Sequence, residues 1–158
     1  MNFHDVIQPE DVILGLEVDS KTRLLKELAR HAAQRSDASA SDITAALAAR
    51  ERLGSTGLGD GIAIPHAKVR GLAKPFAAFV RLARPCPFEA VDDQNVDIVV
   101  LLLLPETSPK EYLNLLARIA RLLRDAELVA RLRQSDDTAA IHRLLGGDPS
   151  LSTATAAA

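Results

Sequence analysis

Residues 97–104 read DIVVLLLL, and this stretch decides the fold. Seven consecutive apolar residues follow Asp97, so both faces of the segment are apolar if it is extended. A strand with two apolar faces belongs at the centre of a sheet that is covered on both sides. Pro105 follows and ends the run, because proline has no N–H to donate to a strand ladder. The stretch therefore predicts a central, buried strand.

Shorter patterns on either side predict the remaining elements. Apolar residues at helical spacing predict a helix over about 20–34, capped by Asp19 or Ser20. A second helix is expected from a cap at Ser41 or Asp42 to near Gly54. Strands are predicted over 12–18, 62–64 and 76–82, and later helices over 109–123, 125–134 and 136–145. Helices alternating with strands imply a single-domain α/β sandwich, in which helices cover a central sheet.

The helix over 109–123 has a clear apolar pattern. The residues expected on its buried stripe are Leu113, Leu116, Ile119, Ala120 and Leu123. The segment 146–158, GGDPSLSTATAAA, is small and polar, and we expect it to be a disordered tail.

The composition is that of a globular protein, with 47% hydrophobic and 25% charged residues in a chain of 158. That length suits one domain with a sizeable core. The net charge of -2 gives no basic bias toward nucleic acid, and an aromatic content of 3% disfavours base stacking. A single cysteine, Cys86, excludes an internal disulfide framework and a multi-thiolate metal site.

Neither secretion nor direct membrane insertion is expected. The N-terminal stretch MNFHDVIQPEDV is acidic and lacks the apolar run of a secretory signal. The longest apolar run, 98–104, is too short to cross a bilayer. The simplest interpretation is a cytoplasmic protein.

The segment 54–67, GSTGLGDGIAIPHA, carries the strongest functional signal. Four glycines fall between Gly54 and Gly61, a density that excludes helix and predicts a loop with unusual backbone geometry. Pro65 restricts the direction in which the chain leaves the strand 62–64, and His66 follows at once. Functional residues often lie on loops that a rigid scaffold holds.

His66 is the candidate nucleophile. A neutral imidazole can attack phosphorus near pH 7 with one nitrogen while the other donates to a carbonyl that fixes the tautomer. The other histidines are expected to be ordinary: His4 lies near the N-terminus, and His31 and His142 are expected at helix surfaces.

Donors for a phosphoryl group surround this histidine in the sequence. Glycine-rich turns form anion-binding concavities, and the candidate phosphate-binding residues are Ser55, Thr56, Gly57 and Asp60. Arg50 ends the preceding helix and offers a forked cation. The alternative is a plain glycine turn with Arg50 as a solvated helix charge. The segment lacks GK[ST] and follows a helix, so it is neither a Walker A loop nor a Rossmann turn.

The run 50–67, RERLGSTGLGDGIAIPHA, closely resembles the active-site signature of the fructose/mannitol-type enzyme IIA domains of the bacterial phosphotransferase system. The match is nearest to the nitrogen-regulatory branch and extends over about residues 5–145. The segment 88–105, FEAVDDQNVDIVVLLLLP, also looks like its family counterpart. The resemblance implies a mixed central β-sheet with helices on both faces.

The resemblance also implies a function. His66 would be the phosphorylated residue, Arg50 would match the family's active-site arginine, and the donor would be the phosphohistidine of an HPr-like carrier. No metal or nucleotide cofactor is required. The chain would signal by its phosphorylation state to partners such as a sensor kinase or a potassium transporter. The alternative is a sugar-transport component that passes phosphate to an enzyme IIB domain.

Two further predictions concern the surroundings of His66. Family members often carry a second histidine where this chain has Tyr112, which is expected either to assist transfer or to be a half-buried helix residue. A carrier is expected to dock over an apolar rim formed by Leu58, Ile62 and Ile64. Hydrolase or metal chemistry at His66 is a minor alternative, because no second histidine or cysteine lies at ligand spacing.

Overall fold

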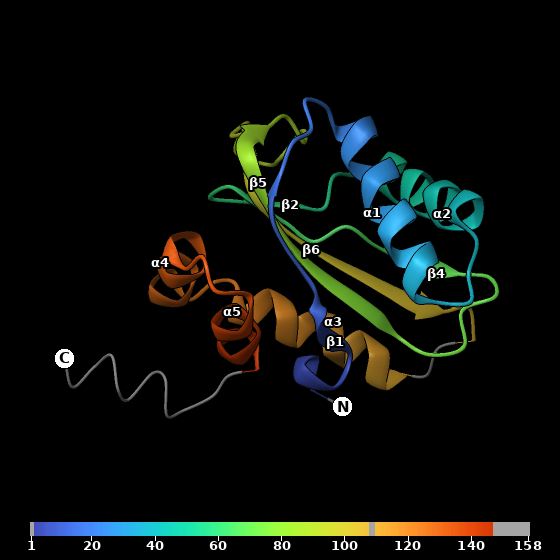
Figure 1. The fold of residues 1–158 in the computed structure, drawn as a ribbon. Coiled ribbons are helices and arrows are strands. Elements are labelled where there is room, and N and C mark those ends of the chain that lie inside the picture. The colour runs from blue at the N-terminus through green and yellow to red at the C-terminus, as the bar shows by residue number, and fades with distance from the viewer. Residues whose placement is uncertain (1, 108–109, 147–158) are drawn as a thin grey trace.

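The computed structural model describes residues 2–107 and 110–146 of the chain, and Figure 1 shows their arrangement. The elements in chain order are η1 (Phe3–Asp5), β1 (Ile7–Leu16), α1 (Lys21–Arg35), α2 (Ala40–Arg52), β2 (Gly57–Gly59), β3 (Ile62–Ala63), β4 (His66–Val69), β5 (Phe76–Cys86), β6 (Val96–Pro105), α3 (Lys110–Leu122), α4 (Ala126–Gln134) and α5 (Thr138–Leu145).

The strand β6 is the centre of the sheet, as the run DIVVLLLL predicts. Its residues from Ile98 to Leu103 have no exposed surface. The sheet has six strands in the order β1-β5-β6-β3-β2, and β4 pairs with β6 beyond the end of β3. β5 runs antiparallel to β6, whereas β3 and β4 run parallel to it. The mixed sheet is thus confirmed.

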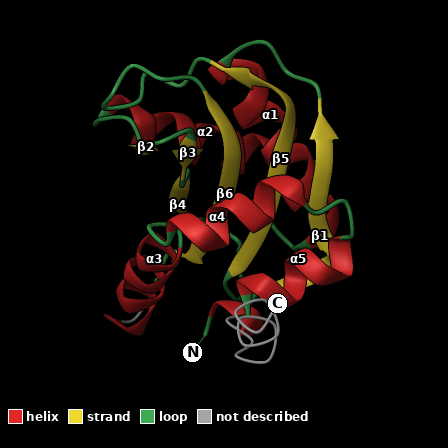
Figure 2. Cartoon of the chain, turned by 90° about the vertical axis from the view of Figure 1, so that its left-hand side faces the viewer, coloured by secondary structure: helices red, strands yellow, loops and turns green. Residues whose placement is uncertain are grey.

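Two apolar clusters cover the two faces of this sheet (Figures 1 and 2). One contains the buried residues of α1 and α2, including Leu24, Leu28 and Leu47. The other contains those of α3, α4 and α5, including Leu115, Val129 and Ile141. Figure 2 shows α4 and α5 in front of the sheet and α3 below β4, with β1 at one edge of the sheet and β2, β3 and β4 at the other. Helices on both faces are therefore confirmed.

The chain continues as a strand after Pro65, where the sequence predicts that the ladder ends. Pro65 cannot donate, but its carbonyl accepts a hydrogen bond of 3.0 Å from the Leu102 amide of β6. His66 then lies in register with Leu102 as the first residue of β4. The proline interrupts the strand without ending it, and this interruption places His66 at the edge of the sheet.

The glycine-rich segment contains a hairpin, of which the strand at 62–64 is predicted and β2, in the predicted loop, is not. β2 and β3 pair antiparallel across a two-residue turn at Asp60 and Gly61. Their φ angles of 56° and 80° lie in the left-handed region that this tight turn requires. At Gly57 a Cβ would lie 2.7 Å from the Cβ of Ala90, so a side chain does not fit there. Close packing thus accounts for part of the glycine content.

Several element boundaries differ from the prediction, among them the end of β5, which continues to Cys86 instead of ending at 82. β1 begins at Ile7 rather than at residue 12, because Pro9 is tolerated in a strand that pairs only with β5. α2 begins at Ala40, and the side chain of Ser39, rather than Ser41 or Asp42, caps it by accepting from the Asp42 amide.

The predicted stripe of α3 is partly wrong. Leu113 is 61% exposed, whereas Leu115, which the prediction omits, is fully buried. Ile119 and Leu123 are buried as predicted. The apolar pattern of this helix is wide, so spacing alone does not fix which of two neighbouring leucines faces the sheet.

Two of the histidines expected at the surface have partners inside the fold. His31 Nε2 lies 2.9 Å from the buried carboxylate of Asp11, and His142 Nε2 lies 2.9 Å from the carbonyl of Ile7. Both join a helix to the edge strand β1. They stabilise the fold at that edge rather than serving as plain solvated groups.

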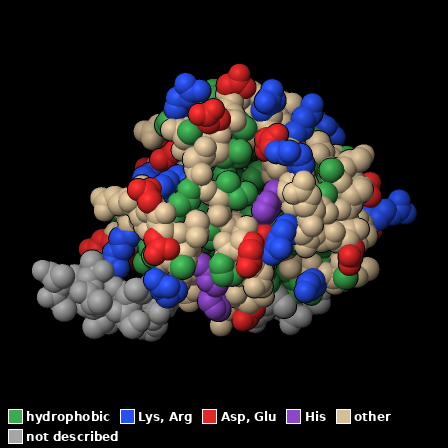
Figure 3. Space-filling model, in the orientation of Figure 1, with side chains coloured by type: hydrophobic (Ala, Val, Ile, Leu, Met, Phe, Trp, Pro, Cys, Tyr) green, Lys and Arg blue, Asp and Glu red, His purple; other side chains and the backbone are tan. Residues whose placement is uncertain are grey.

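Charges of both signs lie interspersed on the face in Figure 3, around an apolar centre. No helix among the described residues is long and apolar enough to cross a membrane. Residues 147–158 of the predicted tail lie outside the described residues.

Truncation of two leucines on α3 tests the corrected helix phase. We expect Leu115→Ala to lower the free energy of unfolding by about 2–5 kcal/mol, because it leaves a cavity beneath the helix. Leu113→Ala should change it by less than about 0.5 kcal/mol, because that side chain is largely in solvent. Urea denaturation of both variants measures the difference, and equal losses would contradict the assignment.

Candidate functional site

The imidazole of His66 is held in one orientation at the sheet edge. Its Nδ1 lies 2.8 Å from the carbonyl oxygen of Ile64. A carbonyl can only accept, so Nδ1 carries the proton and Nε2 keeps a lone pair. The ring is partly buried, and His66 comes directly after Pro65, which interrupts the strand pairing. This is the tautomer that a nucleophilic Nε2 requires.

The surroundings of His66 lower its pKa below the ordinary value of 6.5. Burial is the largest cause, because it disfavours the charged imidazolium. The Ile64 carbonyl raises the pKa, the charge of Arg50 lowers it and the charge of Glu51 raises it. The net result is a ring that is predominantly neutral at pH 7.

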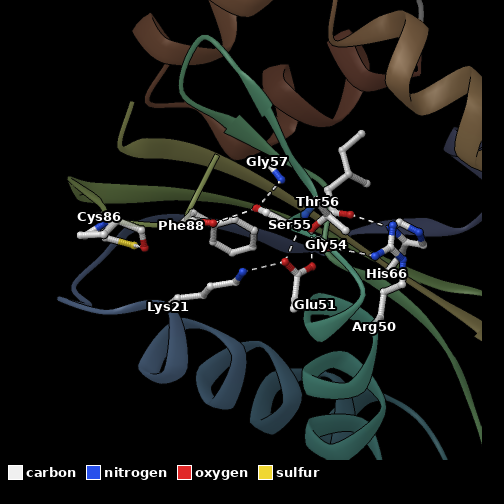
Figure 4. Close-up of polar contacts among 12 residues, drawn as sticks. Lys21, Arg50, Glu51, Gly54, Ser55, Thr56, Gly57, His66, Cys86 and Phe88 are labelled. Carbon is white, nitrogen blue, oxygen red and sulfur yellow. Dashed lines mark hydrogen bonds and ion pairs between the residues drawn. The ribbon is translucent and has the colours of Figure 1, made fainter. Parts of the chain in front are cut away.

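Arg50 lies beside this ring at the end of α2 (Figure 4). Its Nη1 donates to the carbonyl of Gly54 at 2.9 Å, which fastens the guanidinium to the start of the glycine-rich segment. The guanidinium has five N–H donors, and this bond uses one of them. The structure therefore brings together the two residues, His66 and Arg50, that the sequence analysis places at the centre of the site.

Contacts within the protein already engage the four residues predicted to bind phosphate, and phosphate binding by them remains a prediction. The Ser55 hydroxyl donates to the carbonyl of Phe88 at 2.8 Å and accepts from the Gly57 amide at 3.1 Å. The amide and hydroxyl of Thr56 both donate to the carboxylate of Glu51. These donors shape the segment around His66 and already have acceptors.

Asp60 belongs to the hairpin turn rather than to the surroundings of His66. Its amide donates to the carboxylate of Asp92 at 3.0 Å, and its carbonyl accepts from Arg133 at 2.6 Å. The Arg133 guanidinium is also paired with Asp97. Asp60 therefore fixes the turn between β2 and β3.

The predicted docking rim is mostly interior. Ile62 and Ile64 are 3% and 2% exposed and pack in the core, so they offer little contact surface to a partner, although Ile62 lines the same pocket as Leu58. The reason is that β3 lies against the central strand β6. Leu58 alone of the three is exposed, and it lines a pocket of about 440 Å³ between the hairpin and the α3–α4 junction.

Tyr112 lies in α3 and is partly buried against the apolar cluster on that face of the sheet. This position agrees with the prediction of a half-buried helix residue. Assistance to phosphoryl transfer remains a prediction.

Sequence reasoning missed Lys21 and Glu51. Glu51 follows Arg50 in the last turn of α2, and its side chain is 5% exposed. Lys21 begins α1 and pairs with it at 2.9 Å. The available signal was weak: Glu51 is an acidic residue in the last turn of α2, where the helix dipole disfavours a negative charge, but Arg50 and Arg52 in the same turn offset it.

Comparison with known proteins decides the family. The family model of the phosphoenolpyruvate-dependent sugar phosphotransferase system, EIIA 2, matches residues 5–147. The chain belongs to this family. Membership of this family supports the predicted role of the chain as a phosphoryl carrier.

Similar proteins narrow the branch. A nitrogen regulatory protein of Bradyrhizobium diazoefficiens is 45% identical over 149 residues, covering 94% of this chain and 97% of that protein. The crystal structure of nitrogen regulatory protein IIA-Ntr from Neisseria meningitidis is 32% identical, with a TM-score of 0.86 over 90% of this chain and 97% of that one. This enzyme IIA is thus a component of the nitrogen-regulatory type.

A more distant structure shows the same fold. The mannitol enzyme IIA of Escherichia coli, solved in a complex with phosphorylated enzyme IIB, is 19% identical, with a TM-score of 0.74 over 90% of this chain and 99% of that one. At that identity the likeness shows the fold alone.

Nuclear magnetic resonance titration of the imidazole tests the electrostatics of the site. We expect His66 to titrate below 6.5 and to show the tautomer with hydrogen on Nδ1. Arg50→Met should raise the pKa of His66, because it removes a neighbouring positive charge. The control is Arg52→Met, which removes an exposed cation from the same helix turn and should leave the titration unchanged. Equal shifts in both variants would contradict the assignment of Arg50.

Proposed function

We propose that this enzyme IIA accepts a phosphoryl group on Nε2 of His66 from the phosphohistidine of an HPr-like carrier. One observation carries the proposal: the Nδ1–H···O=C bond to Ile64 leaves the lone pair of a neutral ring on Nε2. Membership of the phosphotransferase-system family supports it. No metal or nucleotide takes part, because the donor is itself a phosphorylated protein.

The step exchanges one phosphorus–nitrogen bond for another. The Nε2 lone pair attacks phosphorus while the bond to the donor's imidazole nitrogen breaks, and that nitrogen keeps the bonding electron pair. Positive charge develops on the ring of His66, and the Ile64 carbonyl stabilises it through Nδ1–H. The guanidinium of Arg50 stabilises the phosphoryl oxygens, and such transfers depend mainly on alignment and charge stabilisation.

The output that we propose is regulatory. Phosphorylation adds negative charge and strong hydrogen-bond acceptors to the protein surface, which releases or recruits partner proteins. The relatives named nitrogen regulatory protein favour this output over delivery of phosphate to an enzyme IIB domain. A sensor kinase or a potassium transporter is the kind of target that we propose.

Phosphoryl transfer from a purified, phosphorylated HPr-like carrier tests the acceptor. We expect wild type to gain an acid-labile phosphate and His66→Ala to gain none. Arg50→Met should slow labelling by about 10²- to 10³-fold, as loss of one transition-state donor does, whereas Arg52→Met should label normally. The rate should fall as the pH falls through the pKa of His66, because a protonated Nε2 has no lone pair. Labelling of His66→Ala at the wild-type rate would refute the proposal.

Affinity capture with wild type, His66→Ala and His66→Asp tests the switch. The aspartate adds a permanent negative charge, so at least one partner should bind it differently from the alanine variant. Phosphorylated wild type is captured as a fourth sample. Identical partners in all four samples would argue against signalling by phosphorylation state.

A further inference from the structure

A buried ion pair lies next to the phosphorylation site, and the proposed transfer step gives it no role. The Glu51 side chain is 5% exposed and that of Lys21 is 15% exposed, and the charged atoms lie 2.9 Å apart. Lys21 also lies 4.6 Å from the centre of the Phe88 ring. Figure 4 shows the pair between the start of α1 and the end of α2. Burial of two charges is costly, so their position calls for a function beyond stability.

Hydrogen bonds connect Glu51 to the imidazole. Its two carboxylate oxygens accept from the amide and the hydroxyl of Thr56. The carbonyl of Thr56 accepts from the Ile64 amide at 3.0 Å, and the carbonyl of Ile64 accepts from His66 Nδ1 at 2.8 Å. The Glu51 carboxylate is therefore three hydrogen bonds from the imidazole of His66, and the third is the bond that fixes the tautomer of the ring.

The charge of Glu51 also acts on the site. The charges of Arg50 and Glu51 act on the pKa of His66 in opposite directions: Arg50 lowers it and Glu51 raises it. An unpaired buried carboxylate at this place would repel an incoming phosphoryl group. Lys21 offsets that charge, so Glu51 can hold Thr56 with limited repulsion of the phosphoryl group.

We propose that Glu51, neutralised by Lys21, is a positioning residue for phosphorylation of His66. It holds Thr56, and through Thr56 and Ile64 it fixes the direction of the imidazole. The inference rests on the proposed function of His66, but its geometry does not involve the carrier protein.

Two substitutions separate the charge of Glu51 from its reach. Glu51→Gln keeps the length and removes the charge, whereas Glu51→Asp keeps the charge but is one methylene too short to contact Thr56 and Lys21 together. The matched control is Glu27→Gln, which removes a carboxylate from the ion pair with Arg30 on α1. The two readouts are the pKa of His66 by nuclear magnetic resonance and the rate of labelling by the phosphorylated carrier.

The direction in which the pKa of His66 changes distinguishes loss of the Glu51 charge from a general loosening of the site around the ring. Glu51→Gln should lower the pKa of His66, because it removes a negative charge. It should also slow labelling about tenfold or more, because its amide nitrogen cannot accept from Thr56, so that one of the two bonds that hold Thr56 is lost while the ring stays buried. Glu51→Asp should raise the pKa toward its ordinary value as the ring gains water, and should also slow labelling. Glu27→Gln should match wild type in both readouts.

Several results would overturn the inference. The first is labelling of Glu51→Gln at the wild-type rate. The second is a pKa of His66 that is unchanged or raised in Glu51→Gln. If Glu51→Gln does not fold, Thr56→Val replaces it, and a labelling rate and a pKa equal to wild type would then refute positioning. Failure of wild type to label at His66 would instead refute the proposed function, and the pKa readout would still test the link from Glu51 to the ring.

Discussion

The hydrogen bond from His66 to the Ile64 carbonyl depends on how the chain passes Pro65 beside the central strand. Ile62 and Ala63 pair with β6, Pro65 contributes only its carbonyl, and His66 resumes the pairing. The break leaves the Ile64 carbonyl outside the ladder with β6, where the ring of His66 reaches it. Since a buried carbonyl needs a donor, this contact satisfies the backbone and sets the tautomer at once.

The remaining parts of the site hold this geometry in place. Ser55 connects the glycine-rich segment to Phe88, and Thr56 connects it to Glu51. Arg50 reaches back to Gly54 from the same helix turn. Hydrogen bonds to Phe88 and to the end of α2 therefore hold the glycine-rich segment, although its composition is typical of a flexible loop. The proposed transfer to His66 therefore requires little rearrangement of the site, and such preorganisation favours electrostatic stabilisation of the transferred group.

The parts predicted from sequence are those that depend on neighbours along the chain. The apolar run before Pro105 identified the central strand. The helical spacing of apolar residues after Ser20 identified α1, and Ser20 is the N-cap of that helix. The boundaries of α2 and the phase of α3 were less certain, since Ser39, Ser41 and Asp42 are all competent caps and Leu113 and Leu115 are equally apolar. Ile62 and Ile64 were expected at a rim because nothing local shows that β3 lies against β6.

By itself the sequence determined the layered α/β architecture, the candidate nucleophile His66 and its neighbour Arg50. These follow from apolar periodicity and from a motif that is continuous along the chain. Only the tertiary structure decided which donors around the ring are already occupied, and it alone revealed Glu51 and Lys21. The physical reason is that hydrogen bonds such as Ser55 to Phe88, 33 residues apart, and ion pairs between helices depend on how distant segments pack.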